Sequence, residues 1–215
     1  MKGTVTIAAT FGAGGSLIAP AVARRLGLPF VERAIPIEVA ERIAGPLQAA
    51  LAEDTAEGSA VGRVLDRILA SSGLFVGVAP GPEARGVDRD VAHTEIALRR
   101  IVDAGGAVIL GRAGVFALKG RADVLHVRLD GDVEARRRAA MRHEGIDYAT
   151  ATRLQQHTDQ ARRAYVEHFY PRAGAWEDAR HYHLVLDSTA LSVEACVDLI
   201  ARAAEDRFQS RGDST

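Results

Sequence analysis

Cysteine occurs only once in this sequence, at Cys196, so neither a disulfide framework nor a cysteine zinc site can be built from it. Its place in an apolar helical pattern predicts a buried thiol in a reducing compartment. No apolar run approaches the roughly 20 residues that a membrane-spanning helix needs. The N-terminus has one lysine and then a strand pattern broken by glycines, which is not typical of a signal peptide. We therefore expect a soluble cytoplasmic protein.

Lysine is also scarce: of the 27 Lys and Arg residues, only Lys2 and Lys119 are lysines. The bias is explained by a GC-rich genome, but arginine also matches phosphate geometry bidentately where lysine offers a point charge. An arginine-rich phosphate site is therefore physically reasonable. The formal net charge of −1 gives no indication of binding to nucleic acid or to an acidic membrane. The seven histidines are scattered and suggest no metal cluster.

The 215 residues suit one domain, which we place at 1–208, followed by a disordered tail at 209–215. Near-continuous apolar runs of strand length alternate with helical patterns, which predicts an α/β fold with a parallel sheet covered on both faces. The predicted strands are Thr4–Ala9, Leu28–Glu32, Ala107–Arg112, Val124–Gly131 and Tyr182–Ser188. Ligands of such sheets bind at the carboxyl ends of the strands.

Helical patterns fill the intervals. The first runs from about Ser16 to Leu26, and Pro20 within it predicts a late start or a disturbed first turn. An interrupted helical stretch covers 33–105, and an arginine-rich helical region runs from Val133 to Tyr170. The last helix follows Ser192 as its N-cap.

The stretch "TFGAGGSLIA" directly follows the first strand. Glycines at 12, 14 and 15 allow backbone N–H groups to turn inward around an anion, and the following helix directs its positive end at the same point. Compared with a Walker A loop, the lysine position falls on Gly15 and the metal-ligating hydroxyl position falls on Leu17, while Ser16 lies one residue early. The local sequence leaves two interpretations open, a phosphate loop and a tight turn.

Three further stretches carry candidate residues. Arg112 ends a strand in "VILGRAG", and Arg136 and Arg138 belong to the run "DVEARRRAAMRHEG". Arginines near a phosphate can neutralise charge during phosphoryl transfer, although solvated positions are the common fate of such residues. Asp159 and Arg162 lie one helical turn apart, either as ligands of a polar molecule or as a surface ion pair.

Five stretches together resemble the cytidylate kinase-like proteins, relatives of bacterial cytidylate kinase among the P-loop nucleoside monophosphate kinases. They are "FGAGGSLIA" with "LGLPFVE", "AVILGRAG", "VLHVRLDGDVEARRRAAM", the Asp159/Arg162 helix with Tyr165, Tyr170 and Trp176, and "YHLVLDSTALSVEACVDLI". The resemblance runs from Thr4 to about Ile200. It implies a P-loop NTPase fold of three α/β/α layers, with a five-stranded parallel sheet, an inserted acceptor-binding region at 33–105 and a helical lid within 136–176.

The resemblance also implies roles for individual residues. Donor phosphates and base are held by two loops, comprising Gly12, Ala13, Gly14, Gly15 and Ser16 in the first and Asp187, Ser188 and Thr189 in the second. The acceptor is bound by Arg112, Asp159 and Arg162. Arg112, Arg136 and Arg138 are the catalytic arginines. ATP and Mg²⁺ are the implied cofactors, and metal ligands are not identified.

The sequence departs from cytidylate kinases at Gly15 and Leu17, and it has Leu110 and Ala113 where those enzymes carry acids beside Gly-Arg. We expect a phosphotransferase that moves a phosphoryl group from ATP to a nucleoside monophosphate or similar small acceptor. Two alternatives remain open: a nucleotide-binding sensor without kinase activity, and a kinase for a non-nucleotide acceptor.

Overall fold

The computed structural model describes residues 3–32, 95–96, 98–111 and 113–209. Within them, the predicted parallel sheet of five strands is confirmed. The strands are β1 (Thr4–Ala9), β2 (Phe30–Glu32), β3 (Val108–Leu110), β4 (Val124–Asp130) and β5 (Leu184–Asp187). The helices are α1 (Gly15–Leu26), α5 (Gly114–Ala117), α6 (Val133–Glu144), α7 (Tyr148–Phe169), the short 3₁₀ helix η1 (Ala179–His181) and α8 (Val193–Gln209). Residues 95–96 and 98–103 are also helical.

Strand β1 lies at the centre of the sheet, whose order is β2-β3-β1-β4-β5. Val5 of β1 pairs with Val108 of β3 on one side and with Leu125 of β4 on the other. All three strands are almost entirely buried, as expected for parallel strands covered on both faces. The turn that follows β1 therefore leaves the sheet between the carboxyl ends of β3 and β4.

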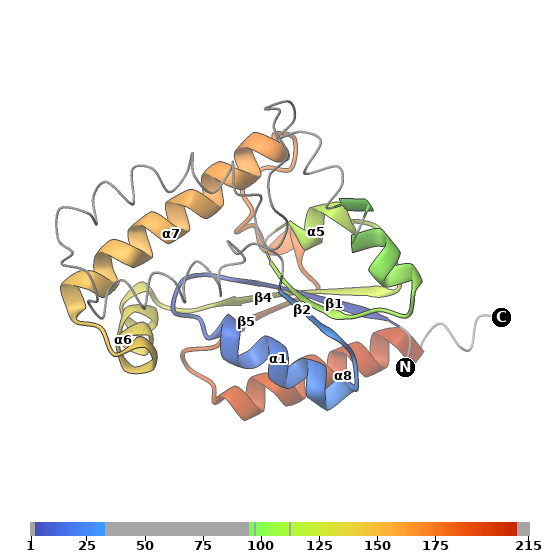
Figure 1. The fold of residues 1–215 in the computed structure, drawn as a ribbon, viewed down its shortest axis with the longest axis horizontal. Coiled ribbons are helices and arrows are strands. Elements are labelled where there is room, and N and C mark those ends of the chain that lie inside the picture. The colour runs from blue at the N-terminus through green and yellow to red at the C-terminus, as the bar shows by residue number, and fades with distance from the viewer. Residues whose placement is uncertain (1–2, 33–94, 97, 112, 210–215) are drawn as a thin grey trace, which may run out of the picture.

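Helices cover both faces of the sheet (Figure 1). Helices α1 and α8 pack on one face, where Ile18, Val22, Cys196 and Ile200 are buried together, and the predicted burial of Cys196 is confirmed. The other face is covered by α5, α7 and the helical residues 98–103. No helix among the described residues is long and apolar enough to cross a membrane.

Helix α1 begins at Gly15, directly after the glycine turn, so Pro20 does not delay it. The carbonyl of Gly14 accepts hydrogen bonds from the N–H groups of Leu17 at 3.0 Å and Ile18 at 2.9 Å, which closes the first turn. Pro20 lies in the second turn and removes only one helical hydrogen bond. The free N–H groups of the helix N-terminus consequently border the loop itself.

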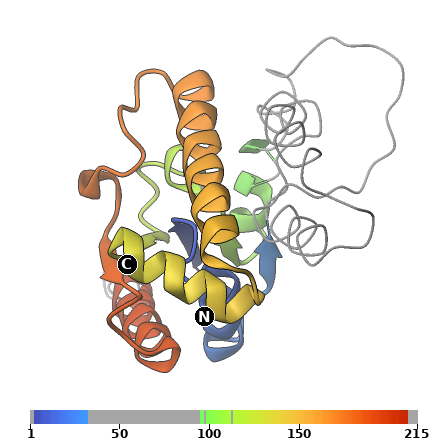
Figure 2. The same cartoon turned by 90° about the vertical axis from the view of Figure 1, so that its left-hand side faces the viewer.

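The helical region predicted at Val133–Tyr170 is divided into α6 and α7. Gly145 ends α6 in the left-handed conformation, with φ of 69°, and Asp147 begins α7 by accepting a hydrogen bond from the Thr150 N–H at 2.7 Å. Asp132 caps α6 in the same way. In Figure 2, α7 stands upright and α6 lies across its lower end.

A buried histidine interrupts the apolar side of β4. His126 pairs with Thr6 across the sheet, and its Nδ1 lies 2.7 Å from the Thr6 hydroxyl. Its ring stacks on that of His183, with centroids 5.1 Å apart. Burial, together with the neighbouring His183 and Arg207, lowers the pKa of His126 to about 4. His126 is therefore neutral in the folded protein near pH 7.

Candidate functional site

The loop between β1 and α1 requires glycine at two positions. Gly12 has φ of 78° and Gly14 has φ of 70°, in the left-handed region that favours glycine. A Cβ at Gly12 would also lie 2.1 Å from the backbone oxygen of Arg136. The loop therefore turns tightly and lies directly against the first turns of α6.

The N–H groups of this loop fall into two sets. Those of Thr10, Phe11 and Ala13 donate hydrogen bonds, to Leu129, Asp159 and Thr10 respectively. Those of the other residues make no hydrogen bond to any part of the chain that the structure describes: Gly12, Gly14, Gly15 and Ser16. Unpaired N–H groups at a helix N-terminus form an anion-binding site, because the helix dipole adds to their partial positive charge.

Side chains from α6, from α7 and from the turn after β5 donate hydrogen bonds to carbonyls at or next to the loop. Arg162 Nη1 donates to the carbonyl of Ala9 at 2.6 Å, and Ser188 Oγ donates to the carbonyl of Ala13 at 2.8 Å. Arg136 Nη1 donates to the carbonyl of Phe11 at 2.9 Å. Because a C=O and the next N–H point in opposite directions across a planar peptide, holding the carbonyls of residues 11 and 13 directs the N–H groups of residues 12 and 14 the other way.

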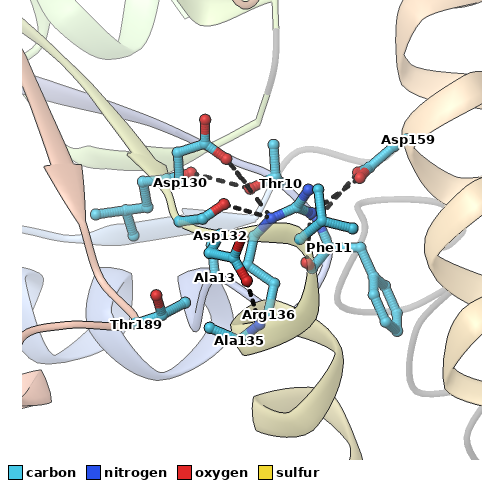
Figure 3. A network of polar contacts seen from close by, with 12 residues as sticks. Thr10, Phe11, Ala13, Asp130, Asp132, Ala135, Arg136, Asp159 and Thr189 are labelled. Atoms are coloured by element: carbon cyan, nitrogen blue, oxygen red, sulfur yellow. Dashed lines mark hydrogen bonds and ion pairs between the residues drawn. The ribbon is translucent and has the colours of Figure 1, made fainter. Parts of the chain in front are cut away.

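Phe11 is held by both its peptide groups and its side chain. Its N–H donates to Asp159 Oδ1 at 3.0 Å, and Asp159 Oδ2 accepts from Arg136 Nη1 at 2.9 Å (Figure 3). The phenyl ring is buried between α6 and α7 in a cluster that comprises Ala140, Ile146, Ala151 and Leu154. The predicted lid region thus contributes directly to the loop's support.

A second carboxylate links the loop to β4. Thr10 Oγ1 donates to Asp130 Oδ1 at 2.9 Å, and Arg128 forms a hydrogen-bonded ion pair with the other oxygen of Asp130. Arg136 Nε lies 3.7 Å from Asp130 Oδ1 and donates to the carbonyl of Gly131 at 3.1 Å. The sequence predicts that ligands bind near the carboxyl end of β4, but it did not predict the contact of Arg128 with Asp130. The feature that could have indicated it is a charged residue within an otherwise apolar strand.

The network carries an excess of positive charge. It contains three arginines whose side chains are 8–10% exposed and two partly buried aspartates: Arg128, Arg136, Arg162, Asp130 and Asp159. Burial lowers the pKa of Arg162 to about 10, opposed by Asp159 and reinforced by Arg136. Arg162 is therefore still charged at neutral pH, and three arginines against two aspartates give these five side chains a formal charge of +1.

The position of the Walker lysine is closed. Gly15 is buried, and a Cβ on it would lie 2.8 Å from the Cβ of Ala9 and 3.2 Å from Cδ1 of Leu110. Leu17, at the hydroxyl position, is 41% exposed and has no oxygen to offer a metal. Residues 3–32, 95–96, 98–111 and 113–209 contain no group of three or more His, Cys, Asp or Glu that could hold a metal ion. The described residues therefore fit the phosphates of a nucleotide, but they do not fit magnesium at the family's positions.

The remaining predicted residues lie around this centre, except Arg112, which lies outside the described residues. Arg138 is 67% exposed on α6 and pairs with Glu134, with Nε and Oε1 3.1 Å apart. Asp187 Oδ1 accepts from the N–H of Thr189 at 3.0 Å and from its hydroxyl at 2.6 Å, which lowers the pKa of Asp187. The turn at 187–189 is thus held by its own side chains, and Ser188 alone of the three contacts the glycine loop.

A parallel sheet of order β2-β3-β1-β4-β5, whose central strand enters a glycine loop and a helix N-terminus, is typical of α/β proteins that bind phosphate groups. The model of the cytidylate kinase-like family matches residues 4–190, and the chain belongs to that family. No curated protein matches the sequence.

Solved structures that resemble this one do so at low sequence identity. An uncharacterized protein from Eubacterium ventriosum is 20% identical with a TM-score of 0.62, and the match covers 94% of this chain and 98% of that one. A gluconokinase from Sinorhizobium meliloti is 15% identical with a TM-score of 0.48 and 97% coverage of both chains. A shikimate kinase from Bacteroides thetaiotaomicron is 14% identical with a TM-score of 0.47, covering 95% of this chain and 99% of that one.

Proposed function

We propose that the protein is a phosphotransferase that moves a phosphoryl group from ATP to a nucleoside monophosphate or a similar small phosphorylated acceptor. The observation that carries the proposal is the set of four N–H groups, at residues 12 and 14–16, left unpaired by the described residues above a buried, net-positive arginine network. These N–H groups would hold the donor phosphates. ATP supplies the phosphoryl group.

The two arginines of α6 take different parts in this proposal. Arg136 is fixed by Phe11, Gly131 and Asp159 and contributes a stationary positive charge beneath the loop. Arg138 is exposed, and its ion pair with Glu134, which is the one that the described residues show, costs little to break, so Arg138 can reach the transferring phosphoryl group. Arg112 lies outside the described residues, and we assign it the role that family membership suggests, which is to bind the acceptor phosphate. The turn at 187–189 would border the donor base.

A second function is favoured by the closed position at Gly15. With no room for a lysine there, and with leucine at 17 and 110, the loop lacks the groups that usually assist phosphoryl transfer. A protein that binds a nucleotide and senses it without turnover would need only the N–H groups and the arginines.

Thermal shift with inorganic pyrophosphate and with ATP, each with EDTA or with MgCl₂, tests the binding that both functions share. A ligand at 100 times its Kd stabilises the fold by about 2.7 kcal/mol, which raises the Tm of a chain of this size by roughly 5–11 °C. Turnover of ATP with each nucleoside monophosphate then separates the two functions. Binding with turnover supports the phosphotransferase, and binding alone supports the sensor.

Helix α1 offers a matched pair of variants that locates the site. Gly14 and Gly27 stand at opposite ends of the helix with φ of 70° and 64°, and a Cβ on either meets no atom closer than 3.6 Å. Gly14→Ala and Gly27→Ala should therefore cost about the same 1–2 kcal/mol in stability. Only Gly14→Ala should weaken pyrophosphate binding, by about tenfold or more. Equal affinities in the two variants would place the anion elsewhere.

A further inference from the structure

Asp159 uses both carboxylate oxygens on groups of the protein itself. Oδ1 accepts the N–H of Phe11 at 3.0 Å and lies 3.4 Å from Arg162 Nη1. Oδ2 accepts from Arg136 Nη1 at 2.9 Å. In Figure 3 the carboxylate points from α7 toward Phe11 and Arg136, so its direction is toward the loop.

These contacts fix one peptide unit on each side of Phe11. Asp159 holds the N–H of Phe11, while Arg136, which it positions, holds the C=O. The C=O of Phe11 shares a rigid peptide with the N–H of Gly12, the first of the unpaired N–H groups. A shift of the carboxylate would therefore rotate a group that the proposed function uses to bind phosphate.

The charge of Asp159 also permits two arginines to lie under the same loop. Arg136 and Arg162 are both buried, and the repulsion between their like charges would destabilise the folded protein unless a carboxylate lay between them. Asp159 contacts both guanidinium groups. Without its charge, the two would separate, and the carbonyls of Ala9 and Phe11 that they hold would move with them.

We propose that Asp159 is a positioning residue of the phosphate loop, in place of the acceptor ligand that family resemblance implies. The inference rests on the proposed phosphate-binding role of this loop. Binding of the donor at the loop would then depend on Asp159 of α7, a helix that lies more than a hundred residues later in the chain.

The test compares Asp159→Asn with Asp147→Asn. Asp147 is the N-cap of the same helix, and its carboxylate likewise accepts a backbone N–H, that of Thr150, but among the described residues no hydrogen bond or ion pair joins it to the loop. Hydrogen bonds to a charged carboxylate are about twice as strong as neutral ones, so amide exchange at Phe11 should become about 5- to 10-fold faster in Asp159→Asn. Exchange there should be unchanged in Asp147→Asn.

Two binding titrations on the same variants distinguish the roles. With inorganic pyrophosphate, Asp159→Asn should bind about tenfold more weakly than the parent protein, while the affinity for a nucleoside monophosphate should change less than twofold. The reverse pattern, with Phe11 exchange unaltered, would make Asp159 an acceptor ligand and overturn the proposal. If the parent protein binds neither ligand, the proposed function fails, and the exchange rates still decide whether Asp159 holds the loop.

A measurement on the parent protein covers the case in which Asp159→Asn does not fold. The Phe11 amide should then be strongly protected from exchange in the parent, in contrast to the unpaired amides of Gly12 and Gly14. A Phe11 amide that exchanges as fast as those two would overturn the inference.

Discussion

Gly15 stands where related P-loops carry lysine, and the structure predicts what any side chain there would do. Its ideal Cβ lies 2.8 Å from the Cβ of Ala9 and 3.2 Å from Leu110 Cδ1, whereas carbon atoms pack best at about 3.5–4.0 Å. The Cβ of Ala9 has no rotamer to change, so β1 or α1 must shift. Overpacking of this kind costs about 1–3 kcal/mol, partly offset by up to about 1 kcal/mol from the better helix propensity of alanine.

Gly15→Ala should therefore lose about 1–2 kcal/mol in the free energy of unfolding, measured by urea denaturation. Removing the opposing methyl group, in Ala9→Gly, costs about 0.5–1 kcal/mol by itself. In the double variant the conflict with the Cβ of Ala9 disappears and only the 3.2 Å approach to the flexible Leu110 Cδ1 remains, so the two changes should couple favourably by about 1 kcal/mol. Strictly additive losses would show that the close approach at Gly15 does not exist.

The same geometry sets the condition for restoring the lysine. Gly15→Lys alone should destabilise the protein and leave ATP turnover at or below the parent level, because the loop must deform to admit the side chain. In the Ala9→Gly background, the lysine has space at its Cβ, and turnover should rise. A single Gly15→Lys variant that is both as stable as the parent and more active would refute the reasoning.

Two other predictions concern charge and pH. Arg136→Ala removes the closer of the two guanidinium groups that contact the partly buried Asp159 carboxylate and should cost about 3 kcal/mol in unfolding free energy, whereas Arg138→Ala at an exposed site should cost less than about 1 kcal/mol; equal losses by urea denaturation would contradict this. The pKa of His126, about 4 when folded, is below its ordinary value of about 6.5, so the unfolded chain binds the proton first as pH falls. The contribution of His126 to the free energy of unfolding is complete above about pH 6.5 and falls as the pH drops from about 6.5 to about 4. At pH 5 it should be smaller by roughly 2 kcal/mol. Urea titrations of His126→Gln should show a flatter pH dependence, with a residual slope from His183, whose pKa burial also lowers; an unchanged slope would exclude His126 as the cause.

Local sequence patterns determined much of the fold. Apolar runs of strand length predicted the five strands, and the glycines at 12, 14 and 15 predicted the turn into α1. Such features depend on residues within a few positions of one another, which is the range over which periodicity and turn chemistry act. The same patterns predicted a helix start disturbed by Pro20, because they do not weigh the hydrogen bonds that Gly14 supplies to the first turn.

Only the tertiary structure decided which charged residues reach the loop. Arg136 and Arg138 belong to one run of arginines, yet one is buried beneath the loop and the other is 67% exposed. The contact of Asp159 with Phe11 joins residues 148 positions apart, and the closed space at Gly15 arises from the approach of β1 and β3. These outcomes depend on the central place of β1 in the sheet and on the packing of α6 and α7 against the loop that follows it. Neither is encoded in a local pattern, because both are set by the packing of side chains from the whole chain at once.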